Sequence, residues 1–275
     1  MWGGVEQTIQ SLADFLIDET CHACRRPVEA TARLALPRAA ASAALAVPLR
    51  VGVSMIGVDT RPLCRACCHG LMAATQPIII GATCADGAIE LVSGGRVPAV
   101  TTVPSRRSSS LVVWPAFETD ERILSMIHAL KFSRRERLAA WLARAMAAGL
   151  PARALESGDS VLMPIPMDRA SLRRRGFNQA ERLARALATH TGATVVDDAL
   201  EKTRATAPQS SLGGAERVRN VAGAMAVRTR ARCEGRTIVL IDDLVTTGAT
   251  AAACATALWG AGARDVRVAC VGYRL

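Results

Sequence analysis

Acidic and hydroxyl-bearing residues gather in the stretch IVLIDDLVTTGAT, residues 238–250. Asp242 and Asp243 follow an apolar run, and the turn TTGAT at 246–250 comes soon after. Carboxylates at the end of a strand typically face metal ions or sugar hydroxyls. Backbone N–H groups and threonine hydroxyls at the start of a helix bind phosphate, and a glycine there removes the Cβ that would keep the ligand away. One short segment therefore carries two kinds of binding group.

The two kinds of group suit a single ligand that combines a sugar with a phosphate. The turn is not a Walker A loop, because no lysine follows Gly248, and it has no GxGxxG pattern. We expect the anion at Thr246, Thr247 and Thr250, away from the aspartates. A ribose 5-phosphate meets both demands, since its 2′- and 3′-hydroxyls reach the carboxylates directly or with Mg²⁺. The alternative is a structural strand–turn–helix with acidic decoration.

Basic residues gather in a second segment, residues 161–187. Arg175 ends a run of arginines just before Gly176, and arginine binds pyrophosphate through bidentate contacts. Asn178 is suited to cap the helix that follows, and Gln179 to contact ligand or backbone. The alternative for the arginine run is a solvated charged face.

Alternating strands and helices are expected to position these residues from about residue 116 onward. Helix-spaced apolar residues occur within 123–145 and 177–189, and an Ala-rich helix is predicted over 249–260. Short apolar runs predict strands at 161–166, 193–196, 237–241 and 266–272. The pattern predicts an α/β fold with a mainly parallel sheet flanked by helices, which binds its ligand at the carboxyl ends of the strands.

Cysteines are concentrated near the amino terminus. Cys21 and Cys24 form one C-x2-C pair, and Cys64 and Cys67 form another. Each pair resembles half of a tetrahedral zinc site with four thiolate ligands, so a structural Zn²⁺ is expected. Competing ligands lie beside the pairs: His22, Cys68 and His69. The alternative is a set of buried cysteines without metal, because the gap between the pairs is long.

Charge and composition restrict the cellular setting. The net charge of +10 favours phosphate-bearing partners, although arginine usage in a GC-rich genome explains it equally well. Only Lys131 and Lys202 are lysines, and surface residues are the more common interpretation for both. The first 20 residues lack the basic start of a signal peptide. The apolar stretch 34–58 is broken by proline and arginine, so no membrane span is expected and a cytoplasmic location is predicted.

The stretch 238–250 is similar to the signature with which type I phosphoribosyltransferases bind 5-phosphoribosyl 1-pyrophosphate (PRPP). The segments RGFNQAE at 175–181 and ERVRNVAGA at 216–224, with the paired cysteines, extend this similarity. Together they resemble the ComF family, amidophosphoribosyltransferase-like proteins linked to competence. The resemblance spans about residues 116–275 and reaches towards the amino terminus through the cysteines.

This resemblance implies a type I phosphoribosyltransferase fold over 116–275, a linker over 86–115, and a small cysteine-rich zinc-knuckle domain over 1–85. It implies that Asp242 and Asp243 are the catalytic acidic pair. The implied PRPP-binding loop consists of Val245, Thr246, Thr247, Gly248, Ala249 and Thr250. The implied contacts to pyrophosphate or substrate are Arg175, Gly176, Asn178, Gln179 and Lys202, the last in a mobile loop.

The implied function is PRPP binding with Mg²⁺ and transfer of the phosphoribosyl group to an unidentified acceptor. Members of the family are associated with uptake of single-stranded DNA, so DNA and DNA-uptake proteins are expected partners. The alternative is a protein without catalysis that binds PRPP or handles single-stranded DNA through its zinc knuckle and arginine-rich surface. Sparse aromatic residues argue against base stacking as the main mode of DNA contact.

Overall fold

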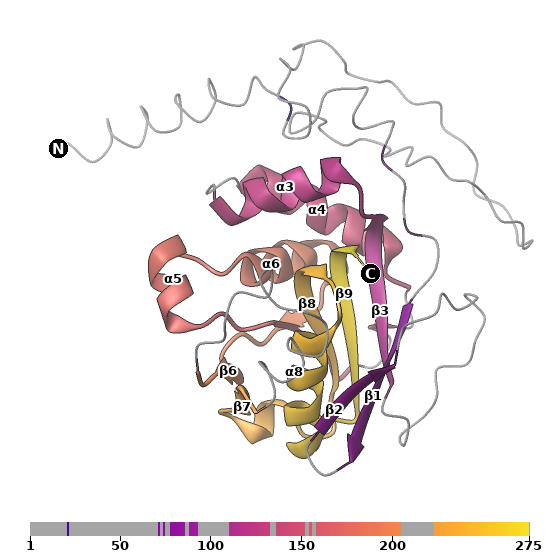
Figure 1. Ribbon diagram of the computed structural model, residues 1–275, viewed down its shortest axis with the longest axis vertical. Coiled ribbons are helices and arrows are strands. Elements are labelled where there is room, and N and C mark those ends of the chain that lie inside the picture. Colours follow the sequence, from indigo (N-terminus) through magenta and orange to yellow (C-terminus); the bar gives the residue numbers. More distant parts are fainter. Residues whose placement is uncertain are drawn as a thin grey trace, which may run out of the picture.

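The computed structural model of the chain is shown in Figure 1. It describes residues 78–85, 88–92, 110–132, 136–151, 154, 155, 158–204 and 223–274, together with Cys21, Leu71 and Ala74.

A seven-stranded sheet forms the centre of the described chain, in the order β2-β1-β3-β9-β8-β4-β5. The parallel strands are β3 (Ser110–Glu118), β9 (Asp265–Tyr273), β8 (Thr237–Val245), β4 (Ser160–Pro164) and β5 (Thr194–Val195). A hairpin of β1 (Ile78–Ala85) and β2 (Ala88–Val92) adds an antiparallel edge next to β3. The mainly parallel sheet predicted from sequence is therefore confirmed.

Helices cover both faces of this sheet, as Figure 1 shows. The helices α3 (Glu121–Phe132), α4 (Glu136–Gly149) and α6 (Gln179–Thr191) contribute to one hydrophobic core, and α8 (Ala249–Gly260) contributes to the other. The strand β8 joins both cores, since Val239 and Ile241 belong to the first and Ile238 and Leu240 to the second. A strand buried on both faces must be apolar on both, which explains the continuous run TIVLI.

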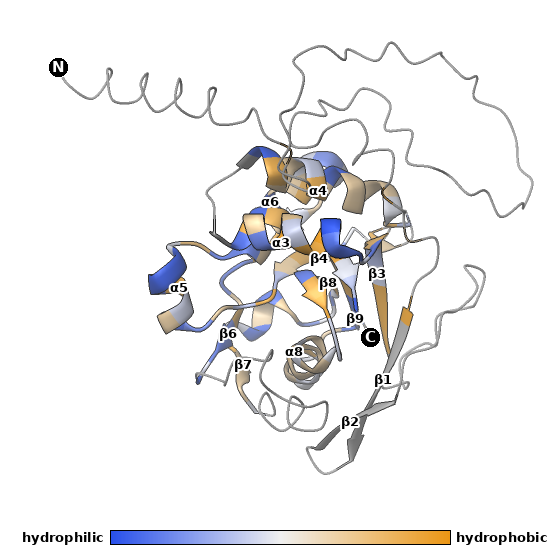
Figure 2. Cartoon of the chain, turned by 45° about the horizontal axis from the view of Figure 1, so that its top comes forward, coloured by the Kyte–Doolittle hydropathy of each residue, from blue (hydrophilic) through white to orange (hydrophobic). Residues whose placement is uncertain are grey.

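Smaller elements lie beside the sheet. A short helix α5 (Arg169–Arg175) follows β4, and β6 (Leu200–Lys202) pairs with β7 (Met225–Val227) in a separate two-stranded sheet. A single 3-10 turn, η3, covers Arg230–Arg232. None of the α5 residues is buried, and much of α5 is blue in the hydropathy view of Figure 2, whereas β4 and the end of β8 are orange.

Capping explains where α5 and α6 begin and end. The Asp168 carboxylate accepts the N–H of Ser171 at 2.8 Å, and the Asn178 side chain accepts the N–H of Ala180 at 3.0 Å. These contacts satisfy donors that a helix start leaves unpaired. The helix α5 ends at Gly176, whose φ of 77° places it in the left-handed region that glycine tolerates. The capping role predicted for Asn178 is confirmed.

The described elements differ from the sequence prediction at two boundaries. The strand predicted over 237–241 continues to Val245, because Asp242 and Leu244 still pair with β9. The acidic pair thus lies inside the strand rather than after it. The predicted linker over 86–115 contains β2 and the first two thirds of β3, whose residues 111–114 are buried. The sheet therefore begins before residue 116, where the sequence interpretation placed the start of the domain.

The helix predicted over 249–260 is confirmed as α8. Of the helices in the described ranges, none combines the length and the apolar character that a membrane crossing requires.

Candidate functional site

The carboxyl ends of β8 and β4 bring the candidate residues to one edge of the sheet. The two strands are parallel neighbours, with Ile241 opposite Pro164. Asp242 and Asp243 lie on β8, and the chain then turns through residues 246–248 into α8. From the end of β4 the chain continues into α5 and α6. The topology therefore places the acidic pair, the threonine turn and the arginine segment on the edge where parallel sheets bind ligands, as predicted.

The two aspartates have different environments. Asp242 is partly exposed, and one of its carboxylate oxygens accepts the N–H of Asp243 at 2.8 Å. Burial by the surrounding protein, and then the charge of Asp243, raise the pKa of Asp242 well above its ordinary value. The Asp243 side chain is only 5% exposed, and its Oδ1 accepts the N–H of Leu244 at 2.9 Å.

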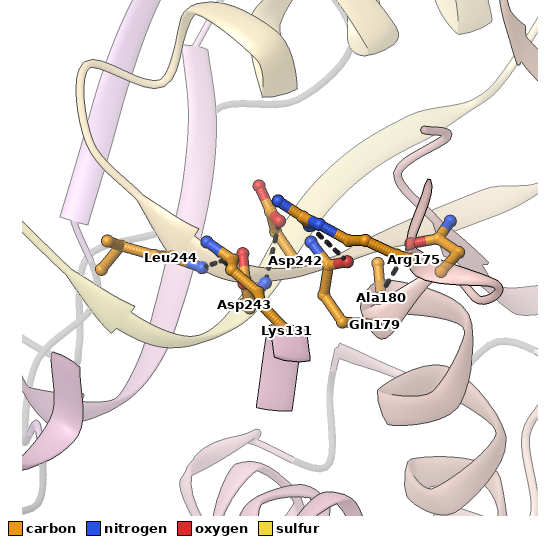
Figure 3. Close-up of polar contacts among 8 residues, drawn as sticks. Lys131, Arg175, Gln179, Ala180, Asp242, Asp243 and Leu244 are labelled. Atoms are coloured by element: carbon orange, nitrogen blue, oxygen red, sulfur yellow. Dashed lines mark hydrogen bonds and ion pairs between the residues drawn. The ribbon is translucent and has the colours of Figure 1, made fainter. Parts of the chain in front are cut away.

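Lys131 supplies the counter-charge for Asp243. Its Nζ lies 2.9 Å from Asp243 Oδ2, as Figure 3 shows. This oxygen is fully buried and makes no well-directed hydrogen bond among the described residues, so the contact is chiefly ionic. Lys131 comes from the last turn of α3, where a cation also meets the negative end of the helix dipole.

The turn before α8 has the backbone geometry of a phosphate site. Gly248 is buried, has φ of 77° and occupies the N-cap position of α8 without a side chain to cap the helix. Thr247 Oγ1 accepts the N–H of Ala249 at a long 3.4 Å. The first turn of α8 holds no acidic residue that would repel an anion. A phosphate bound here would accept from backbone N–H groups and gain from the helix dipole.

The arginine segment divides into exposed and half-buried residues. Arg173 and Arg174 are exposed, and Arg174 donates to the Ser171 hydroxyl at 3.2 Å, so the interpretation as a solvated face fits these two. Arg175 is half-buried and donates from Nη1 to Gln179 Oε1 at 3.1 Å. In Figure 3 its guanidinium group extends in the direction of the Asp242 side chain. Arg175 is thus the arginine of this run that is held at the site.

Asn178 ties the start of α6 to the end of β4. Its side-chain amide donates to the carbonyl oxygen of Ile165 at 3.0 Å, while its side-chain oxygen caps α6. Gln179, the first residue of α6, is buried. Both residues are therefore fixed in the framework that presents Arg175, and their side chains bond within the protein.

Lys202 approaches the same region from β6. Its Nζ lies 3.9 Å from the carboxylate of Asp168, and the two side chains are 14% and 17% exposed. Burial lowers the pKa of Lys202, and the nearby charge of Asp168 partly opposes this effect. The electrostatic influence of Lys202 also reaches the Cys254 thiol on α8, whose pKa is raised by burial and by the charge of Asp242. Lys202 is therefore more enclosed than the surface lysine that its sequence context suggested.

Two residues that contribute charged contacts to the candidate site were not predicted from the sequence. Lys131 was interpreted as a surface residue, and Asp168 was not singled out at all. The signal for Lys131 was its rarity as one of two lysines, but nothing in the sequence indicates that α3 meets β8 at Asp243. Asp168 carries the sequence signal of a helix N-cap, an acidic residue directly before a helix.

The zinc prediction concerns residues that are mostly not described. Cys24, Cys64 and Cys67 lie outside the described residues, and Cys21 is buried. Within the described ranges, no group of three or more potential metal ligands is found. Oxygen donors of the kind that Mg²⁺ prefers are present at the sheet edge, in the Asp242 carboxylate and the threonine hydroxyls. The magnesium site and the thiolate set both stay predictions.

The chain is similar to proteins named for DNA utilization. It is 37% identical over 150 residues to the DNA utilization protein YhgH of Escherichia coli (strain K12), which is 53% of this chain and 65% of that protein. It is 34% identical over 149 residues to the protein of the same name from Salmonella typhimurium, with the same coverage. The chain thus spans slightly less than two thirds of the length of the curated relatives it matches. No protein-family model matches the chain.

Two solved structures that match part of the chain carry phosphoribosylpyrophosphate in their names. Phosphoribosylpyrophosphate synthetase from Mycobacterium smegmatis matches at 20% identity and a TM-score of 0.28, over 53% of this chain and 33% of that one. Glutamine PRPP amidotransferase from B. subtilis matches at 20% identity and a TM-score of 0.32, over 53% and 30%. Because these scores are low, the fold assignment rests on the sheet topology of this chain.

Proposed function

We propose that the chain binds PRPP at the carboxyl edge of its parallel sheet and acts as a phosphoribosyltransferase-like protein of the ComF type. The observation that carries the proposal is the junction of β8 with α8. One continuous segment there presents Asp242, a residue that is partly exposed, and then a helix start whose N-cap, Gly248, lacks a capping side chain. A phosphorylated ribose needs both groups within a few ångströms of each other.

Each part of PRPP has a partner in this arrangement. The ribose hydroxyls would bind the acidic pair, and the 5-phosphate would bind the N–H groups and hydroxyls of residues 246–250. The pyrophosphate would face Arg175, with Lys202 nearby on β6. Bound Mg²⁺ would neutralise the pyrophosphate charge as pyrophosphate leaves.

The proposed reaction is substitution at the anomeric carbon. The bond from this carbon to pyrophosphate breaks, and the acceptor forms a new bond there from the other side of the ring. Positive charge builds on the ring, and Arg175 would stabilise the leaving group, with Mg²⁺ supplying further positive charge when bound. The sequence indicates no dedicated general base.

Calorimetric titration of PRPP in the presence of Mg²⁺ tests the proposal. Wild-type protein should bind, and the double variant Asp242→Asn, Asp243→Asn should not. The matched control is Asp159→Asn, because Asp159 is an exposed carboxylate just before the start of β4, at the opposite edge of the sheet. Unaltered binding by the double variant would show that the site lies elsewhere. Acceptor-dependent release of pyrophosphate would add catalysis to binding.

A DNA-handling protein is the second candidate. The relatives are named for DNA utilization, the net charge is +10, and Arg169, Arg173 and Arg174 are exposed on α5. Contacts to phosphates make binding strongly dependent on salt. Titration with single-stranded DNA at two salt concentrations should therefore show weaker binding at the higher one. DNA binding without turnover of PRPP would favour this candidate over the transferase. In either case we propose a cytoplasmic protein linked to DNA uptake.

A further inference from the structure

The two aspartates that the sequence presents as a pair have different neighbours. Asp243 meets α3, because its Oδ2 lies 2.9 Å from Lys131 Nζ. Asp242 precedes it on β8, and its charge acts on the buried thiol of Cys254 on α8. The two carboxylates still influence each other, since the charge of Asp243 acts on Asp242.

Both oxygens of Asp243 are engaged within the protein. Oδ1 accepts the N–H of Leu244 at 2.9 Å, and Oδ2 lies 2.9 Å from Lys131 Nζ. At 5% exposure this carboxylate has little surface to offer a ligand. Asp242, in contrast, is partly exposed at the same edge.

The Asp243 contacts form a connected path from α3 to the ligand edge. Lys131 holds Asp243, Asp243 holds the N–H of Leu244, and the N–H of Asp243 donates to the carboxylate of Asp242 at 2.8 Å. The path fixes the backbone that leads into the phosphate turn, and it orients the carboxylate of Asp242 (Figure 3). The helix α3 is a firm anchor for this path, because Ile123, Met126 and Leu130 are fully buried.

We propose that Lys131 is a positioning residue of the PRPP site. Its ion pair fixes Asp243 as an internal structural residue, and Asp242 is then the carboxylate that contacts the sugar. This inference rests on the proposed function and assigns different roles within it. A lysine is suited to this ion pair, since its long stem reaches from a helix to the strand while its ammonium pairs with one buried oxygen.

Four variants test the proposal by calorimetric titration with PRPP and Mg²⁺. Lys131→Met leaves the Asp243 charge buried without a partner, and it should weaken PRPP binding at least about tenfold. The double variant Lys131→Met, Asp243→Asn removes both charges, and its affinity should recover towards that of the wild type. Lys131→Arg, which keeps the charge, should bind better than Lys131→Met. Asp242→Asn should bind no PRPP, although its ion pair between Lys131 and Asp243 is intact.

Folding must be monitored with the same variants, because an unpaired buried charge also destabilises the protein. Urea unfolding gives the folded fraction of each variant at the titration temperature. Affinities are compared only between variants that are at least about nine tenths folded. If Lys131→Met falls below that limit, the positioning role is judged from the other two variants. Lys131→Arg still compensates the charge of Asp243, and the double variant removes that charge.

The outcomes separate this inference from the proposed function. Wild-type affinity in folded Lys131→Met overturns the positioning role alone. A double variant as weak as Asp242→Asn also overturns it, because it shows that Asp243 or Lys131 contacts the ligand directly. Absence of PRPP binding by the wild type overturns the proposed function and this inference together.

Discussion

Single residues at the site gain their chemistry from neighbours that lie far away in the sequence. Asp242, Asp243 and the threonine turn were predictable because their ligand groups are contiguous in the chain. Lys131 was not, because its contact with Asp243 joins α3 to β8 across most of the described domain. The resemblance singled out Arg175 from its run, and the structure supplies the physical difference, which is its half-burial and its bond to Gln179. Sequence patterns give the residue types of a site more readily than the contacts between distant elements.

Asp168 provides a residue-scale prediction about pH. Burial pushes its pKa up, but the N–H and hydroxyl of Ser171 and the charge of Lys202 outweigh this effect and hold the pKa below its ordinary value. A carboxyl with a lowered folded-state pKa stabilises the fold above its unfolded-state pKa of about 4 and loses this effect as pH falls further. Asp168→Asn, which keeps a capping oxygen, should thus be less stable than wild type at pH 7, and the difference should shrink below about pH 4.

The matched variant Asp168→Ala removes the cap as well as the charge. Asp168→Ala should lower the stability of α5 by about 1 kcal/mol more than an alanine substitution at another position of the helix does. The cap matters because no buried side chain holds α5 in place. Amide hydrogen exchange in α5 measures both effects. Equal exchange in wild type and both variants at pH 7 would show that Asp168 does not hold this helix.

The strand β9 packs closely against the start of α3 and the residue Thr119 before it at Gly272. A Cβ placed on Gly272 would lie 2.5 Å from Thr119 Oγ1 and 3.2 Å from Ile123 Cγ2. Gly272→Ala should therefore lower the free energy of unfolding by about 1–3 kcal/mol, the usual range for overpacking. Urea unfolding is the measurement.

Two further variants identify the cause of that loss. Adding Thr119→Ala should restore part of the stability, because it removes the nearest clashing atom. Gly260→Ala is the control, since a Cβ there meets nothing within 4 Å. A Gly272→Ala protein as stable as wild type would contradict the close approach of β9 and α3.

The elements themselves were predictable where a strong period or a continuous apolar run marked them. The helix α8 has the predicted bounds, and β8 has the predicted core. The strand β3 was hidden because serines precede its apolar run and Pro115 interrupts it. Its partner β9 lies at the other end of the chain, so the pairing that makes it a central strand has no local signal.

The whole molecule should depend on strands that precede residue 116. A chain that begins at residue 116 lacks Leu111–Trp114, all buried in the two cores, and exposes the edge of β9. We expect it to show no cooperative thermal unfolding. A chain that begins at residue 71 keeps β1, β2 and β3 and should unfold cooperatively. A cooperative transition in the shorter chain would mean that the domain begins where the sequence analysis placed it.

The amino-terminal cysteines make a separate prediction for the molecule. We expect about one Zn²⁺ per chain by metal analysis, held by the thiolates of Cys21, Cys24, Cys64 and Cys67. Cys21→Ser should lower both the zinc content and the thermal stability. Less than about half an equivalent of zinc, with unchanged stability of Cys21→Ser, would instead indicate buried cysteines without metal.

The central claim is that one sheet edge holds the sugar and the phosphate of the same ligand. Comparative calorimetric titration with ribose 5-phosphate and 2-deoxyribose 5-phosphate tests it most directly. Loss of a hydrogen bond from the 2-hydroxyl to a carboxylate should weaken binding to the wild type by about tenfold or more. The same comparison in Asp242→Asn should show little difference between the two sugars. Equal affinity of the wild type for both sugars would contradict the assignment of the Asp242 carboxylate to the ribose.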